Sequence, residues 1–240
     1  MPVKIAINGF GRIGRNIIRC ALEHNRTDLE IVAINDLAPV QTNAHLLRYD
    51  SVHGKFPGNI SVEGNTIDIG RGPIDFSAQP DPSELPWGGV DIVMECTGIF
   101  TSKDAASVHL KNGAKRVLVS APASGADKTI VYGVNHSILT NADRVVSNAS
   151  CTTNCLAPLA SVLNATVGIE KGFMTTIHSY TGDQPTLDRG HSDLYRARAA
   201  ALNIIPTSTG AANAVGLVIP ELEGKLDGVA IRVPTPNVSC

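Results

Sequence analysis

The sequence predicts an α/β fold, and three observations in its first third support this prediction. Residues 3–8 form a short apolar run, residues 12–24 carry apolar side chains at helical spacing, and residues 30–35 form a second run rich in Ile and Val. A strand, a crossover helix and a second strand favour parallel pairing with a right-handed connection. We therefore expect a parallel sheet flanked by helices in this part of the chain.

The later elements are expected to continue this pattern and then to vary it. Residues 59–77 contain short runs broken by Gly, Asn and Asp, which is typical of antiparallel hairpins, and the proline-rich stretch 79–89 is typical of a loop. Strands are also predicted at 91–95, 116–120, 129–132, 144–147 and 168–178, and helices at 102–111 and 152–165. The second of these helices carries Leu156, Leu159, Ala160 and Leu163 on one face.

Composition and charge bound the class of protein. The 240 residues exceed the commonest domain size, and 43% hydrophobic with 18% charged residues indicates a packed core. The formal net charge is −2 without long runs of one sign, so neither nucleic acid nor membrane is an expected partner. The five cysteines are irregularly spaced and no secretory leader is recognisable, so we expect a cytoplasmic protein. The strand–helix alternation ends near residue 150, which predicts domains over 1–150 and 151–240.

A glycine motif follows the first predicted strand. Gly9, Gly11 and Gly14 match Gly-x-Gly-x-x-Gly between a strand and a helix, and Asp36 ends the next strand. In a dinucleotide-binding βαβ unit, such glycines permit a tight turn and a close approach of the backbone to pyrophosphate at the helix N-terminus. Asp36 can accept hydrogen bonds from ribose hydroxyls and would repel a 2′-phosphate. The motif therefore predicts that NAD binds here in preference to NADP.

Cys151 is a candidate nucleophile. It lies in the segment 150–155, SCTTNC, between a predicted strand and a predicted helix. The partial positive charge at a helix N-terminus favours the thiolate, which is the nucleophilic form of cysteine. Ser150 and Thr152 offer hydroxyl groups for helix capping and for binding an anion. Cys155 is interpreted as a small buried residue, and no second Cys/His pair follows at zinc-ligand spacing, so no metal is expected.

A histidine at the end of a strand can serve such a cysteine as a base. His178 ends the strand predicted after the Cys151 helix, and from there it can face the helix start. A lone histidine is more often structural, and spacing does not choose among His136, His178 and His191. The residues by themselves leave the identity of the base open.

Five separated motifs give the whole chain a resemblance to a known family. They are residues 7–15 (INGFGRIGR), 149–155 (ASCTTNC), 177–181 (IHSYT), 206–212 (PTSTGAA) and 232–239 (RVPTPNVS). Together, and in this order, they closely resemble phosphorylating glyceraldehyde-3-phosphate dehydrogenase of the bacterial type. The resemblance implies a Rossmann-like NAD-binding domain, followed by an α+β catalytic domain with a mainly antiparallel sheet.

The resemblance also implies an activity, namely the oxidative phosphorylation of D-glyceraldehyde 3-phosphate to 1,3-bisphosphoglycerate in glycolysis and gluconeogenesis. Cys151 would attack the aldehyde carbon and His178 would take the proton. Hydride transfer to NAD would then leave a thioester that inorganic phosphate cleaves. Thr181 and Arg232 match the site for the substrate's own phosphate. The site for the attacking phosphate is matched by Ser150, Thr152, Thr209 and Gly210, with Arg196 nearby.

The same resemblance assigns further positions to the cofactor. Arg12 and Ile13 match positions that line NAD, and Ser120 lies where a loop passes the nicotinamide. Leu37 follows Asp36 as it does in NAD-preferring members. At Gly190 such members often have proline, so this position leaves the preference undecided.

The resemblance bears on completeness as well. Family members continue beyond the position of Ser239 and form homotetramers, and residues 179–203 match a loop that reaches across a subunit interface. We therefore expect an incomplete catalytic domain, and a 240-residue chain that is a fragment with negligible turnover and no well-behaved tetramer. Two alternatives stay open. One is erythrose-4-phosphate dehydrogenase, which hydrolyses its thioester, and the other is a nucleotide-binding fragment without turnover.

Overall fold

The computed structural model describes residues 1–240, which form two compact units. The first unit comprises Met1–Thr129 and Ile138–Ala149, and the second comprises Ile130–Ser137 and Ser150–Cys240. The chain thus passes from one unit to the other next to residue 150. A single boundary there leaves out the short segment Ile130–Ser137, which groups with the second unit.

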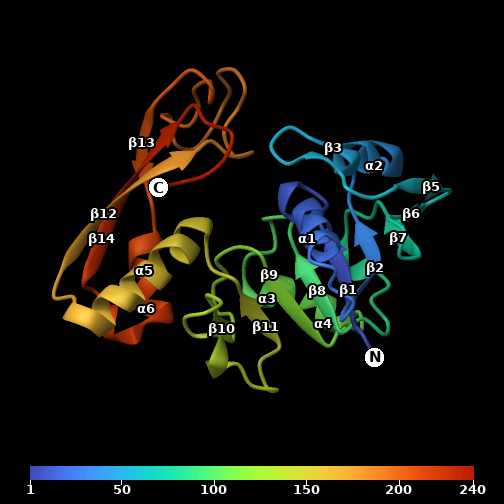
Figure 1. Ribbon diagram of the computed structural model, residues 1–240, viewed down its shortest axis with the longest axis horizontal. Helices are drawn as coiled ribbons and strands as arrows, with labels where there is room; N and C mark the ends of the chain where they lie inside the picture. Colours follow the sequence, from blue (N-terminus) through green and yellow to red (C-terminus); the bar gives the residue numbers. More distant parts are fainter. The chain divides into compact units, whose positions relative to one another are not determined.

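A nine-stranded sheet forms the centre of the first unit (Figure 1). Across the sheet the strands are β10 (Lys128–Thr129), β11 (Val145–Ser147), β9 (Arg116–Val119), β8 (Ile92–Glu95), β1 (Val3–Asn8), β2 (Leu29–Asn35), β7 (Pro73–Ser77), β6 (Thr66–Asp68) and β5 (Ser61–Glu63). Pairing is parallel from β10 to β7, whereas β6 is antiparallel to both of its neighbours. The expected parallel sheet and the expected hairpin region are therefore both present.

Helices cover both faces of this sheet. The unit contains α1 (Arg12–Glu23), α2 (Val40–Arg48), α3 (Lys103–Ala106), α4 (Val108–Lys111), the 3₁₀ turns η1 (Pro82–Glu84) and η2 (His136–Ile138, shared with the second unit), and the hairpin β3 (Tyr49–Asp50) and β4 (Gly54–Lys55). The strand β2 pairs with β1 toward one edge of the sheet, and β9 pairs with β8 toward the opposite edge. Right-handed crossovers in opposite directions place α1 and the α3–α4 pair on opposite faces.

Apolar clusters fill the space between the sheet and these helices, and the one under α3 and α4 contains Ala106 with Val117 and Val119. Ile5 and Ile7 pack in the cluster that also contains Ile18 of α1, whereas Ala6, between them in sequence, packs in the cluster of Trp87. Alternate residues of a strand point to opposite faces, so a strand covered on both sides is apolar at every position. This burial explains why residues 3–8 form a continuous apolar run.

The second unit is built on a three-stranded mixed sheet. Its central strand β14 (Leu226–Val233) is parallel to β12 (Gly172–Ser179) and antiparallel to β13 (Ile205–Ser208). The expectation of a mainly antiparallel sheet is therefore corrected, because the longest pairing is parallel. The chain between β12 and β14 supplies the long crossover that parallel strands need. It contains β13, α6 (Ala211–Val218) and the 3₁₀ turn η3 (Pro220–Leu222), and α6 packs against α5 (Cys151–Val167).

Three expected elements differ from the structure. The strand predicted at 129–132 is only Lys128–Thr129, because the backbone N–H of Val131 donates to Oδ1 of Asn135 in a turn and not to a sheet partner. The helix predicted at 102–111 is divided into α3 and α4 at Ser107. The strand predicted from residue 168 begins later, since Gly168 adopts φ +77° where it ends α5.

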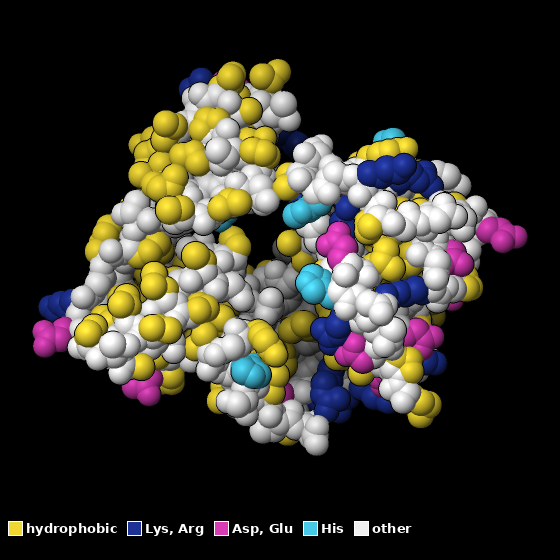
Figure 2. Space-filling model, viewed as in Figure 1, with side chains coloured by type: hydrophobic (Ala, Val, Ile, Leu, Met, Phe, Trp, Pro, Cys, Tyr) yellow, Lys and Arg dark blue, Asp and Glu magenta, His cyan; other side chains and the backbone are white.

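The buried side of α5 is not the one that its leucines predict. Ala157 and Ala160 are buried, whereas Leu159 and Leu163 are 59% and 45% exposed. Apolar side chains gather on the visible surface of this unit (Figure 2). Small residues allow helix backbones to approach closely, which explains why alanines take the packed side. No helix in the structure combines the length and the apolar character that a membrane crossing requires.

Candidate functional site

A pocket of about 430 Å³ lies at the carboxyl ends of β1, β2 and β8 in the first unit. Open α/β sheets bind their ligands at these strand ends, where the loops diverge. The residues that line the pocket are Asn8, Gly9, Gly11, Asn35, Asp36, Leu37, Gln79, Pro80, Pro82, Cys96, Thr97, Ile99 and Phe100. Three of the residues predicted to bind the cofactor, Gly9, Gly11 and Asp36, are therefore brought together here.

The glycines of the motif meet three different steric situations. Gly9 adopts φ +91°, and a Cβ there would lie 2.7 Å from the backbone nitrogen of Thr97. A Cβ at Gly14 would lie 2.4 Å from the carbonyl oxygen of Gly9, so the helix can pack on the loop only without a side chain. A Cβ at Gly11 would meet nothing within 4 Å. Gly9 and Gly14 are thus required by internal packing, whereas Gly11 keeps open the space in front of the helix.

The N-terminus of α1 offers donors to that open space. Its N-cap residue is Gly11, and no side chain caps the first turn. The first N–H groups of a helix have no partner within the helix, and together with the helix dipole they favour a bound anion. The residues therefore fit the pyrophosphate of a dinucleotide.

The carboxylate of Asp36 is oriented by the backbone around it. Oδ2 accepts from the backbone N–H of Phe10 at 2.8 Å, and Oδ1 accepts from the backbone N–H of Ala38 at 3.0 Å. Nδ2 of Asn43 donates to Oδ1 at 3.3 Å. A carboxylate has about four acceptor positions, so Asp36 keeps capacity for a ribose hydroxyl. It ties the glycine loop to the end of β2 and also faces the pocket.

The remaining predicted cofactor residues lie outside the lining of this pocket. Arg12 forms an ion pair with Asp50 at 2.5 Å, and Ile13 is 50% exposed on the first turn of α1. Ser120 follows β9, and its side chain hydrogen-bonds Cys96, whose pKa is raised to about 11 by burial. Thr97 and its neighbours were missed by sequence reasoning. The signal for them was available, because they follow a buried strand that runs parallel to β1.

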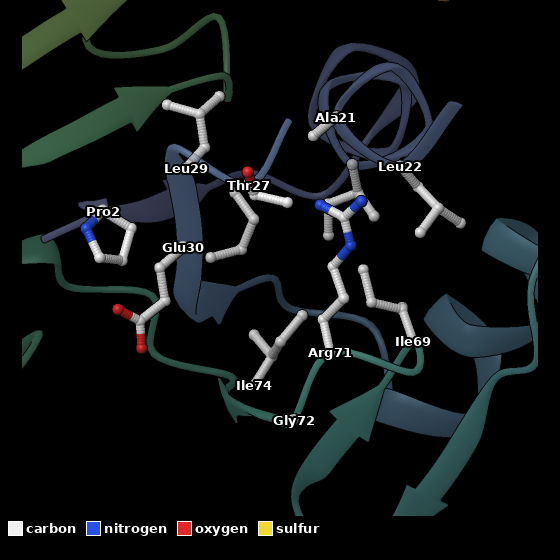
Figure 3. Close-up of a pocket in the computed structure, with 12 residues that line it drawn as sticks. Pro2, Ala21, Leu22, Thr27, Leu29, Glu30, Ile69, Arg71, Gly72 and Ile74 are labelled. Carbon is white, nitrogen blue, oxygen red and sulfur yellow. The ribbon is translucent and has the colours of Figure 1, made fainter. Parts of the chain in front are cut away.

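A second pocket, of about 390 Å³, lies at the opposite end of α1 (Figure 3). Apolar side chains such as Leu22, Ile69 and Ile74 form most of its lining. Its arginine, Arg71, donates to the carbonyl of Arg26 and to Oδ1 of Asn25, so the guanidinium joins the pocket wall to the loop after α1. We assign no chemistry to this pocket.

Cys151 is the first residue of α5 in the second unit. The N-cap residue Ser150 accepts from the backbone N–H of Thr153 at 3.1 Å, which secures the helix start. Ala149, immediately before it, adopts φ +57°, a left-handed conformation that L-residues rarely take outside sharp turns. This turn leaves Cys151 exposed at a helix N-terminus, where the dipole favours a thiolate.

His178 faces Cys151 from the end of β12. Its Nε2 lies 3.2 Å from Sγ of Cys151, and its Nδ1 lies 2.6 Å from the carbonyl oxygen of Ser179. A carbonyl can only accept, so Nδ1 carries the proton of the neutral ring and Nε2 keeps its lone pair. Nη1 of Arg232, 3.1 Å from Nδ1, is then a neighbouring charge and not a hydrogen-bond donor to it. The lone pair of His178 therefore points at the thiol.

The surroundings of His178 keep its ring neutral. Burial lowers the pKa of His178 below its usual 6.5, and the positive charges of Arg232 and Arg196 lower it further, against the effect of the hydrogen bond to Ser179. A neutral imidazole next to a thiol can accept its proton at neutral pH. The pair is therefore built for nucleophilic catalysis by Cys151 with His178 as the base.

Arg232 and Thr181 lie together beside this pair. Arg232 stands opposite His178 in the register of β12 and β14, and its Nη1 donates to Oγ1 of Thr181 at 3.4 Å. Its Nε is buried without a hydrogen-bond partner, and burial lowers the pKa of the guanidinium. A half-buried cation with an unused donor fits an anionic group of a ligand.

The residues predicted for the attacking phosphate lie at two helix starts. Ser150 and Thr152 begin α5, whereas Thr209 and Gly210 precede α6, and Oγ1 of Thr209 accepts from the backbone N–H of Ala211. Arg196 lies beside β13, where its Nε donates to Oγ1 of Thr207 at 2.9 Å. The grouping of these residues around one anion stays a prediction.

Both units of the chain match known proteins in sequence. Residues 3–103 match the family model described as the NAD binding domain of glyceraldehyde 3-phosphate dehydrogenase, and residues 150–240 match its C-terminal domain. The chain is 73% identical to a glyceraldehyde-3-phosphate dehydrogenase of Xanthobacter flavus and 71% identical to one of Cereibacter sphaeroides. It is 59% identical to glyceraldehyde-3-phosphate dehydrogenase 1 of Bacillus subtilis. Each comparison covers 100% of this chain and 72% of the relative.

Substitutions of Gly11 and Gly14 by alanine are expected to have opposite effects on stability and on dinucleotide binding. Gly14→Ala should lower the free energy of unfolding by about 1–3 kcal/mol, because the added methyl group meets the Gly9 carbonyl. Gly11→Ala should change stability little, since its methyl group meets no protein atom, but it should weaken dinucleotide binding. Urea unfolding and calorimetric titration with NAD measure both quantities. Equal stability losses in the two variants would contradict this assignment.

The orientation of His178 predicts the reactivity of Cys151. Alkylation of Cys151 by iodoacetamide should persist below about pH 8.5, where an isolated thiol loses its thiolate. His178→Asn should move the profile to higher pH, because the proton acceptor is removed. His136→Asn is the matched control, since His136 contacts the backbone of Gly133. A His178→Asn profile that coincides with that of the control would exclude His178 as the base.

Proposed function

The chain belongs to the glyceraldehyde-3-phosphate dehydrogenase family, and we propose that the intact enzyme of which it is a part oxidises D-glyceraldehyde 3-phosphate with NAD through a thioester on Cys151. The observation that carries this proposal is the 3.2 Å contact between Sγ of Cys151 and the unprotonated Nε2 of His178. It supplies a nucleophile and its base in the part of the chain that matches the C-terminal domain of the family. The product is 1,3-bisphosphoglycerate, which places the reaction in glycolysis and gluconeogenesis.

The first step is the attack of Cys151 on the aldehyde. The thiol proton moves to Nε2 of His178, a sulfur–carbon bond forms, and the proton returns to the carbonyl oxygen to give a thiohemiacetal. His178 then accepts the hydroxyl proton as the carbon loses hydride, which leaves a thioester on Cys151. The thioester keeps the free energy of oxidation that direct hydrolysis would lose. NAD, when bound, supplies the hydride acceptor.

Inorganic phosphate completes the reaction. One of its oxygens attacks the thioester carbonyl, the sulfur–carbon bond breaks, and the thiolate of Cys151 is regenerated with the acyl phosphate as product. Two anion sites are needed. We assign Arg232 and Thr181 to the phosphate of the substrate, and the residues at the starts of α5 and α6 with Arg196 to the attacking phosphate. The buried, unpartnered Nε of Arg232 supports the first assignment.

NAD is assigned to the pocket at the carboxyl ends of β1, β2 and β8. Gly11 and the start of α1 would hold the pyrophosphate, and Asp36 would hold the ribose hydroxyls. We also assign Arg12, Ile13 and Ser120 to the cofactor on the family resemblance. Gly14 acts indirectly, since it lets α1 pack on the loop.

Two properties of the whole protein follow from the same premise. We propose that the complete protein is a homotetramer, which the exposed apolar side chains of the second unit support, among them Leu159, Val162 and Leu163 of α5. Light scattering after size-exclusion chromatography tests it, and a monomer at all concentrations would overturn it. We also propose a cytoplasmic location, which the five free thiols support.

Kinetics of NADH formation by the intact enzyme test the proposed chemistry, since the 240-residue chain by itself is expected to have negligible turnover. Cys151→Ser should lower turnover by at least about a thousandfold, because a hydroxyl next to a neutral imidazole is a much weaker nucleophile. Cys155→Ser, one helical turn along α5, is the matched control and should have little effect. Turnover should also require inorganic phosphate. Equal rates in the two variants would exclude Cys151, and phosphate-independent turnover would point to erythrose-4-phosphate dehydrogenase or another hydrolysing relative.

Cofactor preference tests the role of Asp36. Asp36→Asn removes the charge that repels a 2′-phosphate but keeps an acceptor for the backbone of Phe10. NADP should therefore bind more tightly to the variant, by about tenfold, while NAD binds more weakly. Calorimetric titrations with both cofactors measure the change. If the parent protein binds NADP as well as NAD, Asp36 is not the discriminating group.

A further inference from the structure

A buried polar network lies directly beneath the cofactor pocket. Its centre is Glu95, the last residue of β8, which is 1% exposed. Oε2 accepts from Nδ2 of Asn8 at 2.7 Å and contacts Nε2 of His109 at 2.9 Å. Oε1 accepts from the backbone N–H of Thr97 at 2.8 Å and from the Thr97 hydroxyl. All four partners approach a side chain that no water reaches.

The donors and acceptors of this network fix its protonation state. Nε1 of Trp87 donates to Nδ1 of His109 at 2.9 Å, and an indole nitrogen can only donate. His109 therefore accepts at Nδ1 and carries its proton on Nε2, which it donates to Glu95. Three of the four groups around Glu95, namely Nδ2 of Asn8, Nε2 of His109 and the backbone N–H of Thr97, can only donate. The hydrogen bonds therefore require His109 to accept at Nδ1, and they present donors to both oxygens of Glu95, as a carboxylate needs.

Both sides of the cofactor pocket are tied to this carboxylate. Asn8 ends β1 and accepts from Nδ2 of Asn35 at 2.9 Å, while Thr97 follows β8 and its hydroxyl accepts from the backbone N–H of Ile99. Gly9 lies between them with no room for a methyl group. The carboxylate thus joins the side chain of Asn8 to Thr97, in addition to the backbone hydrogen bond from Cys96 to Asn8 that links the ends of β1 and β8.

We propose that Glu95 is a positioning residue for the dinucleotide pocket, oriented by the His109–Trp87 pair. Its carboxylate holds Asn8 and Thr97 at the spacing that the Gly9 turn requires, so that the open surface at Gly11 is shaped before the cofactor arrives. Such preorganisation strengthens binding, because less of the binding free energy is used to order the site. The inference deepens the proposed function, since it concerns the same NAD pocket.

The substitution Glu95→Gln tests this role with almost no change of shape. Whichever way the amide is turned, its NH₂ group faces a donor that cannot accept, either the backbone N–H of Thr97 or Nδ2 of Asn8 and Nε2 of His109. The variant should bind NAD about tenfold more weakly, the loss expected when hydrogen bonds to a charged group fail. Glu63→Gln, the same change at an exposed position on β5, is the matched control and should bind as the parent does.

Hydrogen exchange of the cofactor-free protein separates positioning from general stability. In Glu95→Gln the backbone amides of residues 8–11 and 96–99 should exchange faster, while those of β9 and β11 keep the parent rates. Rates that match the Glu63→Gln control, or a uniform loss across the whole sheet, would overturn the proposal. A parent protein that does not bind NAD would instead refute the proposed function, and the exchange rates would still decide the role of Glu95.

A measurement on the parent protein tests the proposal even if the Glu95→Gln variant does not fold. The ¹⁵N chemical shifts of His109 distinguish the two neutral tautomers from the imidazolium. The network requires a protonated Nε2 and an unprotonated Nδ1. An imidazolium, or a neutral ring protonated on Nδ1, would overturn the assignment of Glu95 as an ionised acceptor oriented by His109.

Discussion

The backbone carbonyl of Ser179 accepts a hydrogen bond from Nδ1 of His178, and the chemistry of the second unit depends on which ring nitrogen carries that proton. With Nδ1 protonated, Nε2 presents a lone pair to Cys151. The register of β12 and β14 then sets Arg232 beside the same ring, where its charge opposes protonation. The backbone acceptor therefore determines the tautomer and the direction of proton transfer, whereas burial and the arginines keep the base neutral.

The pocket of the first unit depends on a steric constraint, whereas the site of the second unit depends on the position of a proton. The β1–α1 turn brings the backbone of Gly9 against Thr97 and the start of α1 against Gly9, so two of the three motif glycines are used to pack protein on protein. The third leaves the helix N-terminus uncovered. A ligand site of this kind is made by removing side chains, and the polar residues beneath it keep the uncovered backbone from collapsing. The β1–α1 turn is thus packed tightly against the protein at Gly9 and Gly14, and it leaves the N-terminus of α1 uncovered at Gly11.

The sequence predicted the features of the fold that arise from local pattern. Apolar runs located the buried parallel strands, and the position of Gly9, Gly11 and Asp36 relative to those strands located the pocket. It did not predict distances between distant residues, so it left His136, His178 and His191 equivalent until a family resemblance separated them. The helix α2 was missed, because its buried positions include Asn43 and an alanine as well as larger apolar residues. The side of α5 that its leucines predict to be packed is also not the buried one. Apolar spacing does not distinguish a side that packs through alanines from one that exposes leucines.

The two arginines near the second-unit site differ in what surrounds them. Arg232 contacts neutral oxygens of Ser179 and Thr181, whereas Arg196 lies 3.2 Å from Asp183 and 3.3 Å from Asp193. The neighbourhood of Arg196 is thus negative overall, and an approaching anion feels little long-range attraction to it. An anion that binds Arg196 therefore competes with two carboxylates for the same guanidinium. The charge of Arg232 is therefore uncompensated by any carboxylate in contact with it, whereas Arg196 favours groups that compete with a carboxylate at close range.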